Sequence, residues 1–205
     1  IRGNSLRKYI DAGISTDHET FRYDEGEEKL SLGMRLLVRE GSAAKNFDEL
    51  SPLIAKYPRL CMFCSDDKHP DDLVTGHINE LARRSLRLGI DIITVLRCAC
   101  VNPVEHYGLD VGLLRIGDFA DFVEVDSLER LNILSTFIKG DIVAENGRSF
   151  LPHIPALHVN KFNATKKDVR EFTVTPKGKS VKVIEAINTQ LITGRLDTQV
   201  KIVKG

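Results

Sequence analysis

The chain has 205 residues, enough for one sizeable domain or one and a half, with 42% hydrophobic and 28% charged residues. Acidic and basic residues balance at 29 each, so we expect neither nucleic acid nor an anionic membrane as a partner. No apolar run approaches the roughly 20 residues of a membrane helix.

The N-terminal part alternates amphipathic stretches with short apolar runs. Helices are predicted over residues 4–12, 24–33 and 47–56, and strands over residues 14–16, 34–38 and 60–64. Asn4 or Ser5 is expected to cap the first helix. The apolar runs are continuous, which is typical of parallel strands buried on both faces. Strands that alternate with helices indicate βαβ units, so this part is predicted to be α/β.

The middle of the chain is predicted to be helical and then to change character. Residues 77–88 form one amphipathic stretch, residues 92–100 form a second that Asp91 can cap, and a third begins at residue 102 with Pro103 in its first turn.

Turn residues separate β-prone runs after Gly108. Residues 137–147 predict a hairpin with an Asn-Gly turn nearby. Prolines at 152, 155 and 176 mark an irregular connector, and apolar residues that alternate over 181–203, including Val200 and Ile202, predict further strands. We therefore expect three regions, residues 1–108, 109–150 and 151–205.

Four cysteines, Cys61, Cys64, Cys98 and Cys100, admit two interpretations. The spacing of the first two occurs in zinc ribbons and redox motifs, but a four-thiolate zinc site needs such a pair twice. Packing as small buried hydrophobes is the stronger interpretation. Unpaired buried thiols predict a reducing, cytoplasmic compartment.

Two acidic-histidine clusters follow predicted strands. The first cluster, residues 14–19, contains His18 between Asp17 and Glu19, and the second cluster, residues 61–72, contains Asp66 just after its strand. Catalytic groups collect at the carboxyl ends of strands in parallel α/β barrels. Histidine and aspartate together suit a divalent metal that activates water.

Individual residues of these loops have both functional and structural explanations. Asp66 could bind a metal and accept a proton from water, while Asp67 and Ser42, which also follows a strand, could contact a substrate. Alternatively His18 is a surface residue, Asp66 and Asp67 form a cap or turn before Pro70, and Ser42 lies in a flexible turn. The occurrence of both clusters at strand ends favours a site.

Three motifs resemble the adenine deaminase family of the amidohydrolase superfamily. They are AGISTDHE at residues 12–19, REGSAAKN at residues 39–46 and SDDKHPDDL at residues 65–73. The NPVE sequence at residues 102–105 and residues 112–125 resemble the part of the family that leads into its small β-sandwich domain. The resemblance extends in order over nearly the whole chain.

This resemblance implies a metal-dependent (β/α)8 barrel that converts adenine to hypoxanthine and ammonia by attack of metal-bound hydroxide at C6. It implies that His18 is the metal ligand after the sixth strand and that Asp66 is the metal-binding aspartate and proton shuttle after the eighth. Glu19 is then catalytic, and Asp67 and Ser42 are substrate-binding. The metal would be manganese or iron, with zinc also compatible.

The chain lacks the family's His-x-His pair and the ligands of its fourth and fifth strands. We therefore expect a partial (β/α)8 metal-dependent hydrolase barrel, comprising the last three βα units over residues 1–108, with part of a small β-sandwich domain over residues 109–150. Residues 151–205 would be a connector and the start of a C-terminal β-rich region. Such a piece is expected to be inactive alone, with its metal incomplete or absent.

Open sheet edges also predict a homo-oligomer. Two alternatives stay open beside a cytoplasmic enzyme of purine metabolism. One is another amidohydrolase, either cytosine deaminase-like or dihydroorotase-like. The other is a non-catalytic interaction module derived from a barrel.

Overall fold

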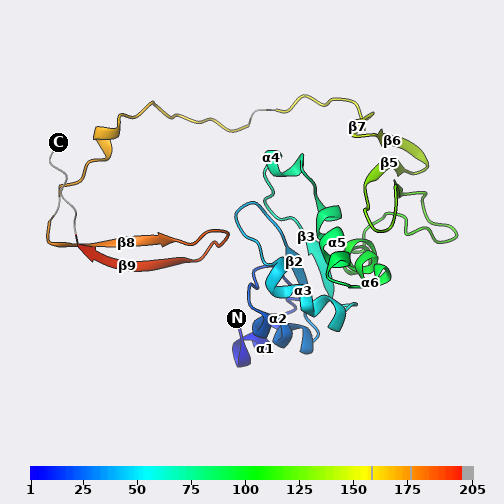
Figure 1. The fold of residues 1–205 in the computed structure, drawn as a ribbon, viewed down its shortest axis with the longest axis horizontal. Coiled ribbons are helices and arrows are strands. Elements are labelled where there is room, and N and C mark those ends of the chain that lie inside the picture. Colours follow the sequence, from blue (N-terminus) through cyan, green and yellow to red (C-terminus); the bar gives the residue numbers. More distant parts are fainter. Residues whose placement is uncertain (158, 176, 200–205) are drawn as a thin grey trace. The chain divides into compact units, whose positions relative to one another are not determined.

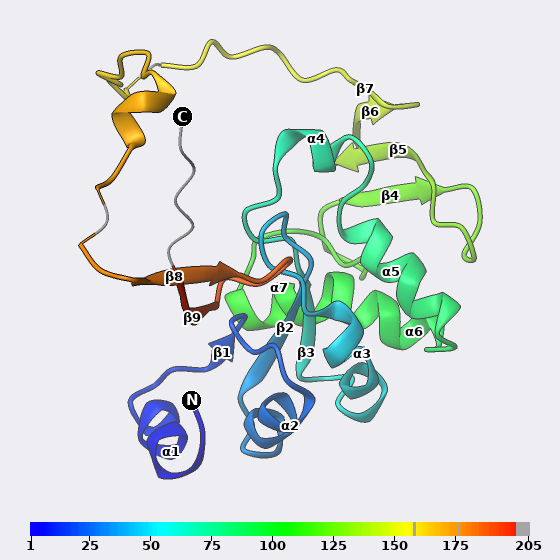
Figure 2. The ribbon, with the colours of Figure 1, turned by 60° about the vertical axis from the view of Figure 1, so that its left-hand side comes forward.

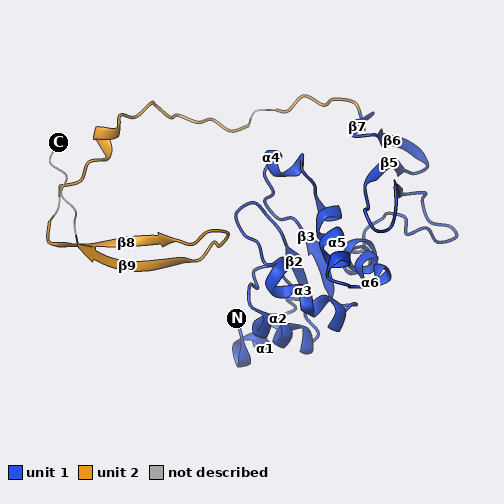
Figure 3. Cartoon of the chain, viewed as in Figure 1, with its two compact units in different colours: residues 1–151 blue, residues 152–205 orange. Residues whose placement is uncertain are grey.

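The computed structural model describes residues 1–157, 159–175 and 177–199. The chain divides into two compact units, residues 1–151 and residues 152–205 (Figure 3). Unit 1 contains a parallel and an antiparallel sheet, and unit 2 contains one antiparallel hairpin. Among the described residues, each helix is too short or too polar to span a bilayer.

A three-stranded parallel sheet with interleaved helices forms the first part of unit 1 (Figure 1). Its strands lie in the order β1 (Thr16–Asp17), β2 (Arg35–Arg39) and β3 (Cys61–Cys64). The helices are α1 (Gly3–Asp11), α2 (Tyr23–Ser31) and α3 (Phe47–Lys56). The predicted alternation is confirmed, but the predicted cap is wrong. Arg2 is the N-cap of α1 and makes no side-chain capping bond.

In the core of unit 1, α2 and α3 pack on β2 (Figure 2), and side chains of β3 and of residues 81–98 belong to the same buried cluster. Leu36 and Val38, at alternate positions of β2, are fully buried with Leu50 and Leu53 of α3. Each such side chain contributes about 1.5–3 kcal/mol when it is fully buried. This packing fixes the sheet from which the polar loops emerge.

A helical segment follows β3. It consists of α4 (Pro70–Leu73), α5 (Ile78–Arg87), α6 (Ile92–Leu96), the π-helix η1 (Arg97–Val101) and α7 (Asn102–Tyr107). Asp91 caps α6 as predicted, because its carboxylate accepts a 2.9 Å bond from the Thr94 N–H. The predicted helix over 92–100 instead changes to a π-helix at residue 97.

Asn102 joins this helical segment to β3. Its side chain is buried and donates to the carbonyls of Pro58 at 2.8 Å and Cys61 at 2.7 Å. Buried carbonyls without a hydrogen-bond partner are costly, so the Asn102 side chain stabilises the backbone at the start of β3.

The antiparallel sheet of unit 1 consists of β4 (Phe122–Val125), β5 (Ile133–Ile138), β6 (Asp141–Glu145) and β7 (Arg148–Ser149). Phe122 and Phe137 lie opposite each other and stack with 4.4 Å between ring centroids. The hairpin predicted over 137–147 turns at Lys139 and Gly140, and the Asn-Gly pair forms the next turn, between β6 and β7. Both turns have positive φ at both residues, as a type I′ turn requires.

Unit 2 contains β8 (Ser180–Ala186) and β9 (Thr193–Gln199), which pair along their full length, and a short 3-10 turn η2 (Val169–Phe172). These strands agree with the alternation predicted over 181–203, of which Val200 and Ile202 lie outside the described residues. Nearly every described residue of the two strands is exposed, and an isolated hairpin is marginally stable in water.

The four cysteines are free thiols; Cys61 and Cys98 agree with the interpretation as small buried hydrophobes, whereas Cys64 is half-buried and Cys100 is exposed. Cys61 and Cys64 are three positions apart in β3, so their side chains lie on opposite faces of the strand. Cys61 and Cys98 are fully buried. Burial raises the pKa of the Cys61 thiol, and it raises the pKa of the Cys98 thiol to about 12.

Candidate active site

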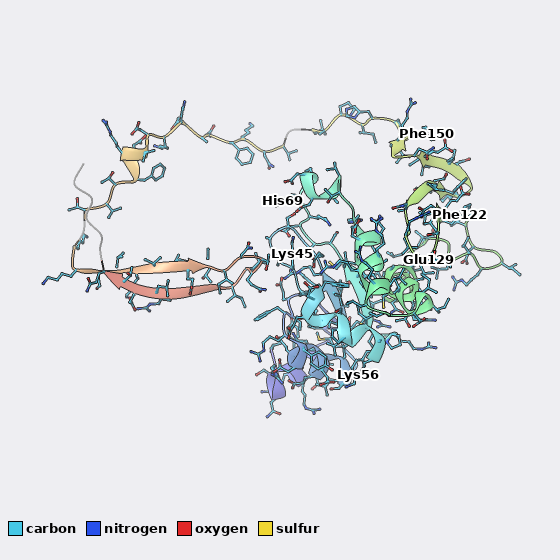
Figure 4. The ribbon with its side chains drawn as sticks, viewed as in Figure 1. Lys45, Lys56, His69, Phe122, Glu129 and Phe150 are labelled. Carbon is cyan, nitrogen blue, oxygen red and sulfur yellow. The ribbon has the colours of Figure 1, made fainter. Side chains whose placement is uncertain are left out.

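The carboxyl ends of β1, β2 and β3 meet at one edge of the parallel sheet, called the carboxyl edge below. The loop over residues 18–22 follows β1, the loop over residues 40–46 follows β2, and the loop over residues 65–69 follows β3. Lys45 and His69 mark the second and third of these loops in Figure 4. Both clusters found in the sequence therefore lie at the same edge.

Asp17 anchors the first cluster to the body of unit 1. One carboxylate oxygen accepts from the N–H and the hydroxyl of Thr20, both at 2.8 Å, and the other accepts from Lys29 Nζ at 3.0 Å. Burial alone would raise the pKa of Asp17. The bonds from Thr20 and Lys29 lower it by more than burial raises it, so the pKa lies below its ordinary value. Asp17 is therefore a structural carboxylate.

Lys29 reaches this anchor from α2. Its side chain is only 2% exposed, and its ammonium also contacts the Glu25 carboxylate and the Thr20 hydroxyl, both at 2.7 Å. A buried ammonium must be paired, and these three acceptors provide the pairing.

His18 and Glu19 extend outward from the anchored turn. Their side chains are 46% and 62% exposed, and His18 Nε2 lies 3.2 Å from Glu19 Oε1. Because Asp17 fixes the turn, the His18 imidazole and the Glu19 carboxylate project from the carboxyl edge.

Arg39, the last residue of β2, connects the two clusters. Its side chain is 5% exposed, and its two terminal nitrogens lie 3.2 Å from Glu19 Oε2 and 2.8 Å from Asp66 Oδ2. Arg39 begins the REGSAAKN motif, just after the strand predicted over residues 34–38, and the sequence alone did not indicate this role. A charged residue directly after a buried apolar run is the signal that could have revealed it.

The second cluster begins with a turn in which Asp66 has a φ of +47°, in the left-handed region. Asp67 follows, and its carboxylate lies close to the backbone of Gly41. A Cβ atom at Gly41 would lie 2.9 Å from Asp67 Oδ1, so only glycine leaves this carboxylate where it is.

Ser42 links the loop after β2 to the loop after β3. Its hydroxyl donates to the Asp72 carboxylate and accepts from the His69 N–H at 2.8 Å. The bond from Ser42 lowers the pKa of Asp72. Beyond it, His77 Nε2 lies 2.7 Å from the Ser65 hydroxyl, and burial together with Lys68 lowers the pKa of His77.

The donor types at the carboxyl edge fit part of a metal site. His18 offers an imidazole, and Asp66 offers Oδ1, for which the described part of the chain supplies no hydrogen bond. Imidazole and carboxylate suit manganese, iron or zinc. Over residues 1–157, 159–175 and 177–199, no group of three His, Cys, Asp or Glu side chains is arranged to hold a metal ion.

The structure thus brings Glu19 and Asp66 together through Arg39, with His18 beside Glu19. Asp67 and Ser42 lie in the two loops that close against each other at Gly41 and His69.

Comparison with known proteins gives consistent results. A sequence model of the amidohydrolase family matches residues 11–143. The chain is 52% identical over 194 residues to an adenine deaminase of Salinibacter ruber, covering 95% of this chain and 36% of that protein. It is 50% identical over 210 residues to an adenine deaminase of Methanosarcina mazei, covering 95% of this chain and 38% of that protein. The chain therefore spans little more than a third of the length of these relatives.

Solved structures share the fold at lower sequence identity. A beta-aspartyl dipeptidase from Fervidobacterium islandicum AW-1 in complex with a beta-Asp-Leu dipeptide matches 76% of this chain and 48% of its own, with a TM-score of 0.56 and 18% identity. Another structure of that dipeptidase matches 65% of this chain and 37% of its own, with a TM-score of 0.51 and 20% identity.

Proposed function

The chain belongs to the amidohydrolase family, and we propose that it forms one side of the hydrolytic site of a longer adenine deaminase. One observation carries this proposal. Arg39 joins Glu19 of the first cluster to Asp66 of the second at the carboxyl edge of a parallel sheet. Catalytic groups collect at this edge in parallel α/β barrels, and the similar proteins named adenine deaminase supply the substrate class.

In this proposal the parallel part of unit 1 is the last three βα units of a (β/α)8 barrel. Residues 109–150 then belong to the small β domain, and residues 151–205 lead from it into a further β-rich region. The parallel β1-β2-β3 sheet and the antiparallel β4–β7 sheet support this assignment.

His18 and Asp66 would hold a divalent metal, manganese or iron being preferred over zinc, together with ligands from other parts of the protein. When bound, such a metal lowers the pKa of a coordinated water from about 15.7 toward about 7 and supplies hydroxide near neutral pH.

The carboxylates of this chain would move the protons of the reaction. The water oxygen forms a bond to C6 of adenine, the bond from C6 to the amino nitrogen breaks, and the products are hypoxanthine and ammonia. Asp66 takes one proton from the attacking water and passes it to the leaving nitrogen, and Glu19 gives a proton to the ring nitrogen N1 and regains one from the new C6 hydroxyl as it becomes the carbonyl. Both are within reach of solvent and share the Arg39 cation.

Asp67 and Ser42 would bind the purine. Gly41 leaves the Asp67 carboxylate in place, and Ser42 holds the loop that follows Asp67. The likeness to beta-aspartyl dipeptidases extends to the fold alone and does not favour a peptide substrate.

The test compares the full-length protein that carries this chain with the 205-residue chain alone. Both are loaded with Mn²⁺ or Fe²⁺ and assayed for ammonia release from adenine and cytosine and for hydrolysis of dihydroorotate. We expect the full-length protein to form hypoxanthine from adenine, and the isolated chain to be inactive. Turnover of cytosine or dihydroorotate instead of adenine, or hypoxanthine formation by the isolated chain, would contradict the proposal.

Two variants of the full-length protein sharpen this test. His18→Ala and Asp66→Asn should each lower the bound metal content measured by atomic emission, and Asp66→Asn should lower kcat by about 10²–10⁴-fold. Absence of metal from the wild-type protein, together with normal fold, would support the alternative of a non-catalytic interaction module.

We also propose that the 205-residue chain forms a homo-oligomer when it is isolated, because β1 and β3 lie at the edges of the described parallel sheet and open edges invite pairing. Light scattering coupled to size-exclusion chromatography decides between a monomer and an oligomer.

A further inference from the structure

A buried cation lies between the two acidic loops. Arg39 ends the central strand β2, and its partners Glu19 and Asp66 follow the strands on either side. The guanidinium is 5% exposed, whereas the Glu19 side chain is 62% exposed and the Asp66 side chain 29% exposed. A buried charge must be compensated, so the buried guanidinium pairs with both carboxylates while the carboxylates themselves remain in contact with solvent.

The backbone of Arg39 is itself held on both sides. Its N–H donates to the Asn46 side-chain oxygen at 2.6 Å, and its carbonyl accepts from the Asn46 N–H at 3.0 Å. The Asn46 side chain is buried and also donates to the Thr20 carbonyl at 2.7 Å. The guanidinium therefore has a fixed base, and the loop that bears Glu19 is attached to the same asparagine.

The bonds from Arg39 use one oxygen of each carboxylate. Asp66 accepts through Oδ2 and Glu19 through Oε2, while Glu19 Oε1 lies beside His18 Nε2. Asp66 Oδ1 has no hydrogen-bond partner within the described ranges. Asp66 thus keeps one oxygen for another ligand, whereas the second oxygen of Glu19 contacts His18.

We propose that Arg39 is the positioning residue that orients Asp66 and Glu19 for metal binding and proton transfer. This inference rests on the proposed function of the same site. Groups that orient metal ligands from behind commonly change metal affinity or activity by about 10–100-fold when they are removed.

The geometry requires arginine in particular. Two terminal nitrogens of one planar group reach two carboxylates on separate strands, whereas the lysine ammonium is a compact point charge. The Arg39 Nε atom is buried and has no partner among the described residues, so the cation is directed wholly through its two terminal nitrogens. Loss of the cation would leave both carboxylates without their shared positive partner.

The experiment uses the full-length protein with Arg39→Met and Arg39→Lys. Arg87→Lys is the matched control, because Arg87 lies on α5 and makes no ion pair or side-chain hydrogen bond within the described parts of the chain. Three quantities are measured: Mn²⁺ affinity by electron paramagnetic resonance, kcat with adenine, and KM for adenine.

For Arg39→Met we expect about 10–100-fold lower Mn²⁺ affinity and a kcat lower by a similar factor, with KM changed less than threefold. Arg39→Lys should recover part of the loss, and Arg87→Lys should match the wild type. A purely structural role would instead lower the folded fraction while kcat per metal-loaded site stays unchanged, and that result would overturn the inference.

The outcomes also separate this inference from the proposed function. If the wild type binds Mn²⁺ but does not hydrolyse adenine, the proposed function fails, and the Mn²⁺ affinity of Arg39→Met still decides the role of Arg39. If the wild type turns over adenine and Arg39→Met retains its kcat and Mn²⁺ affinity, the positioning role alone is wrong. If the wild type binds no Mn²⁺, both fail.

Discussion

The ammonium of Lys29 lies 3.0 Å from the carboxylate of Asp17, the residue directly before His18. Their side chains are 2% and 12% exposed, so this pair is shielded from water. Lys29 belongs to α2, and the pair therefore ties a core helix to the turn that presents His18 and Glu19. The conformation of that turn therefore depends on the Lys29–Asp17 ion pair, which takes no part in the proposed reaction.

Lys29→Met should lower the free energy of unfolding by about 3–5 kcal/mol, because it leaves two partly buried carboxylates, Asp17 and Glu25, without their cation. Urea denaturation followed by circular dichroism measures this change. Lys8→Met is the control, since Lys8 is exposed on α1 and its replacement should change stability by less than about 0.5 kcal/mol. Equal stability of the two variants would show that the buried pair contributes little.

Stability should decrease in acid through the same pair. Burial raises the pKa of Asp17 and of Glu25, but bonds from Thr20 and Lys29 to Asp17, and from Lys29 to Glu25, lower both pKa values overall. Carboxylates with depressed pKa in the folded state stabilise it above their unfolded values, about 3.9 for Asp and 4.3 for Glu. That contribution is lost as the pH falls below about 4 toward the folded pKa.

Urea midpoints measured at several pH values between neutrality and pH 3 test this expectation. The wild type should lose stability steeply below about pH 4, and Asp17→Asn should show a shallower decline because one of the titrating groups is gone. Parallel declines in the two proteins would exclude Asp17 as a source of the acid sensitivity.

Gly41→Ala should weaken substrate binding through Asp67. The added Cβ would lie 2.9 Å from Asp67 Oδ1, so the carboxylate must move. In the full-length protein we expect KM for adenine to rise several-fold with a smaller change in kcat. Gly178→Ala is the control, since a Cβ there meets no heavy atom within 4 Å. An unchanged KM in Gly41→Ala would argue against Asp67 as a purine contact.

The cysteines should react with iodoacetamide in two groups. Cys61 and Cys98 are fully buried, and burial raises the pKa of both thiols, that of Cys98 to about 12. They should stay unlabelled in native buffer and become labelled in urea, as mass spectrometry of peptides can show. Cys100 is exposed and should label without denaturant, more slowly than a fully solvated thiol because desolvation raises its pKa. Rapid native labelling of Cys61 would contradict its place in the core.

Much of the parallel sheet could be predicted because apolar runs determine it directly. The helix expected over 47–56 has those bounds, and both acidic-histidine clusters do follow strands. The change to a π-helix at residue 97 was missed, since the apolar spacing of residues 92–100 fits an ordinary helix equally well.

The polar framework of the site was harder to predict. Lys29 reads as one more charge on an amphipathic helix, and Arg39 as the start of a polar loop, yet both are nearly inaccessible to water. Their burial depends on carboxylates that lie 12 and 27 positions away in sequence. Local pattern carries no information on such pairings, whereas the outward-facing His18, Glu19 and Asp66 stand out by residue type alone.

The left-handed backbone at Asp66, with its φ of +47°, restricts how this position can be changed. Asparagine and aspartate tolerate that conformation better than other side chains, and glycine adopts it freely. Asp66→Asn therefore removes the charge alone, and Asp66→Gly removes the side chain while relaxing the turn. Asp66→Ala would combine a chemical loss with a conformational penalty, so few replacements at this position change the carboxylate alone.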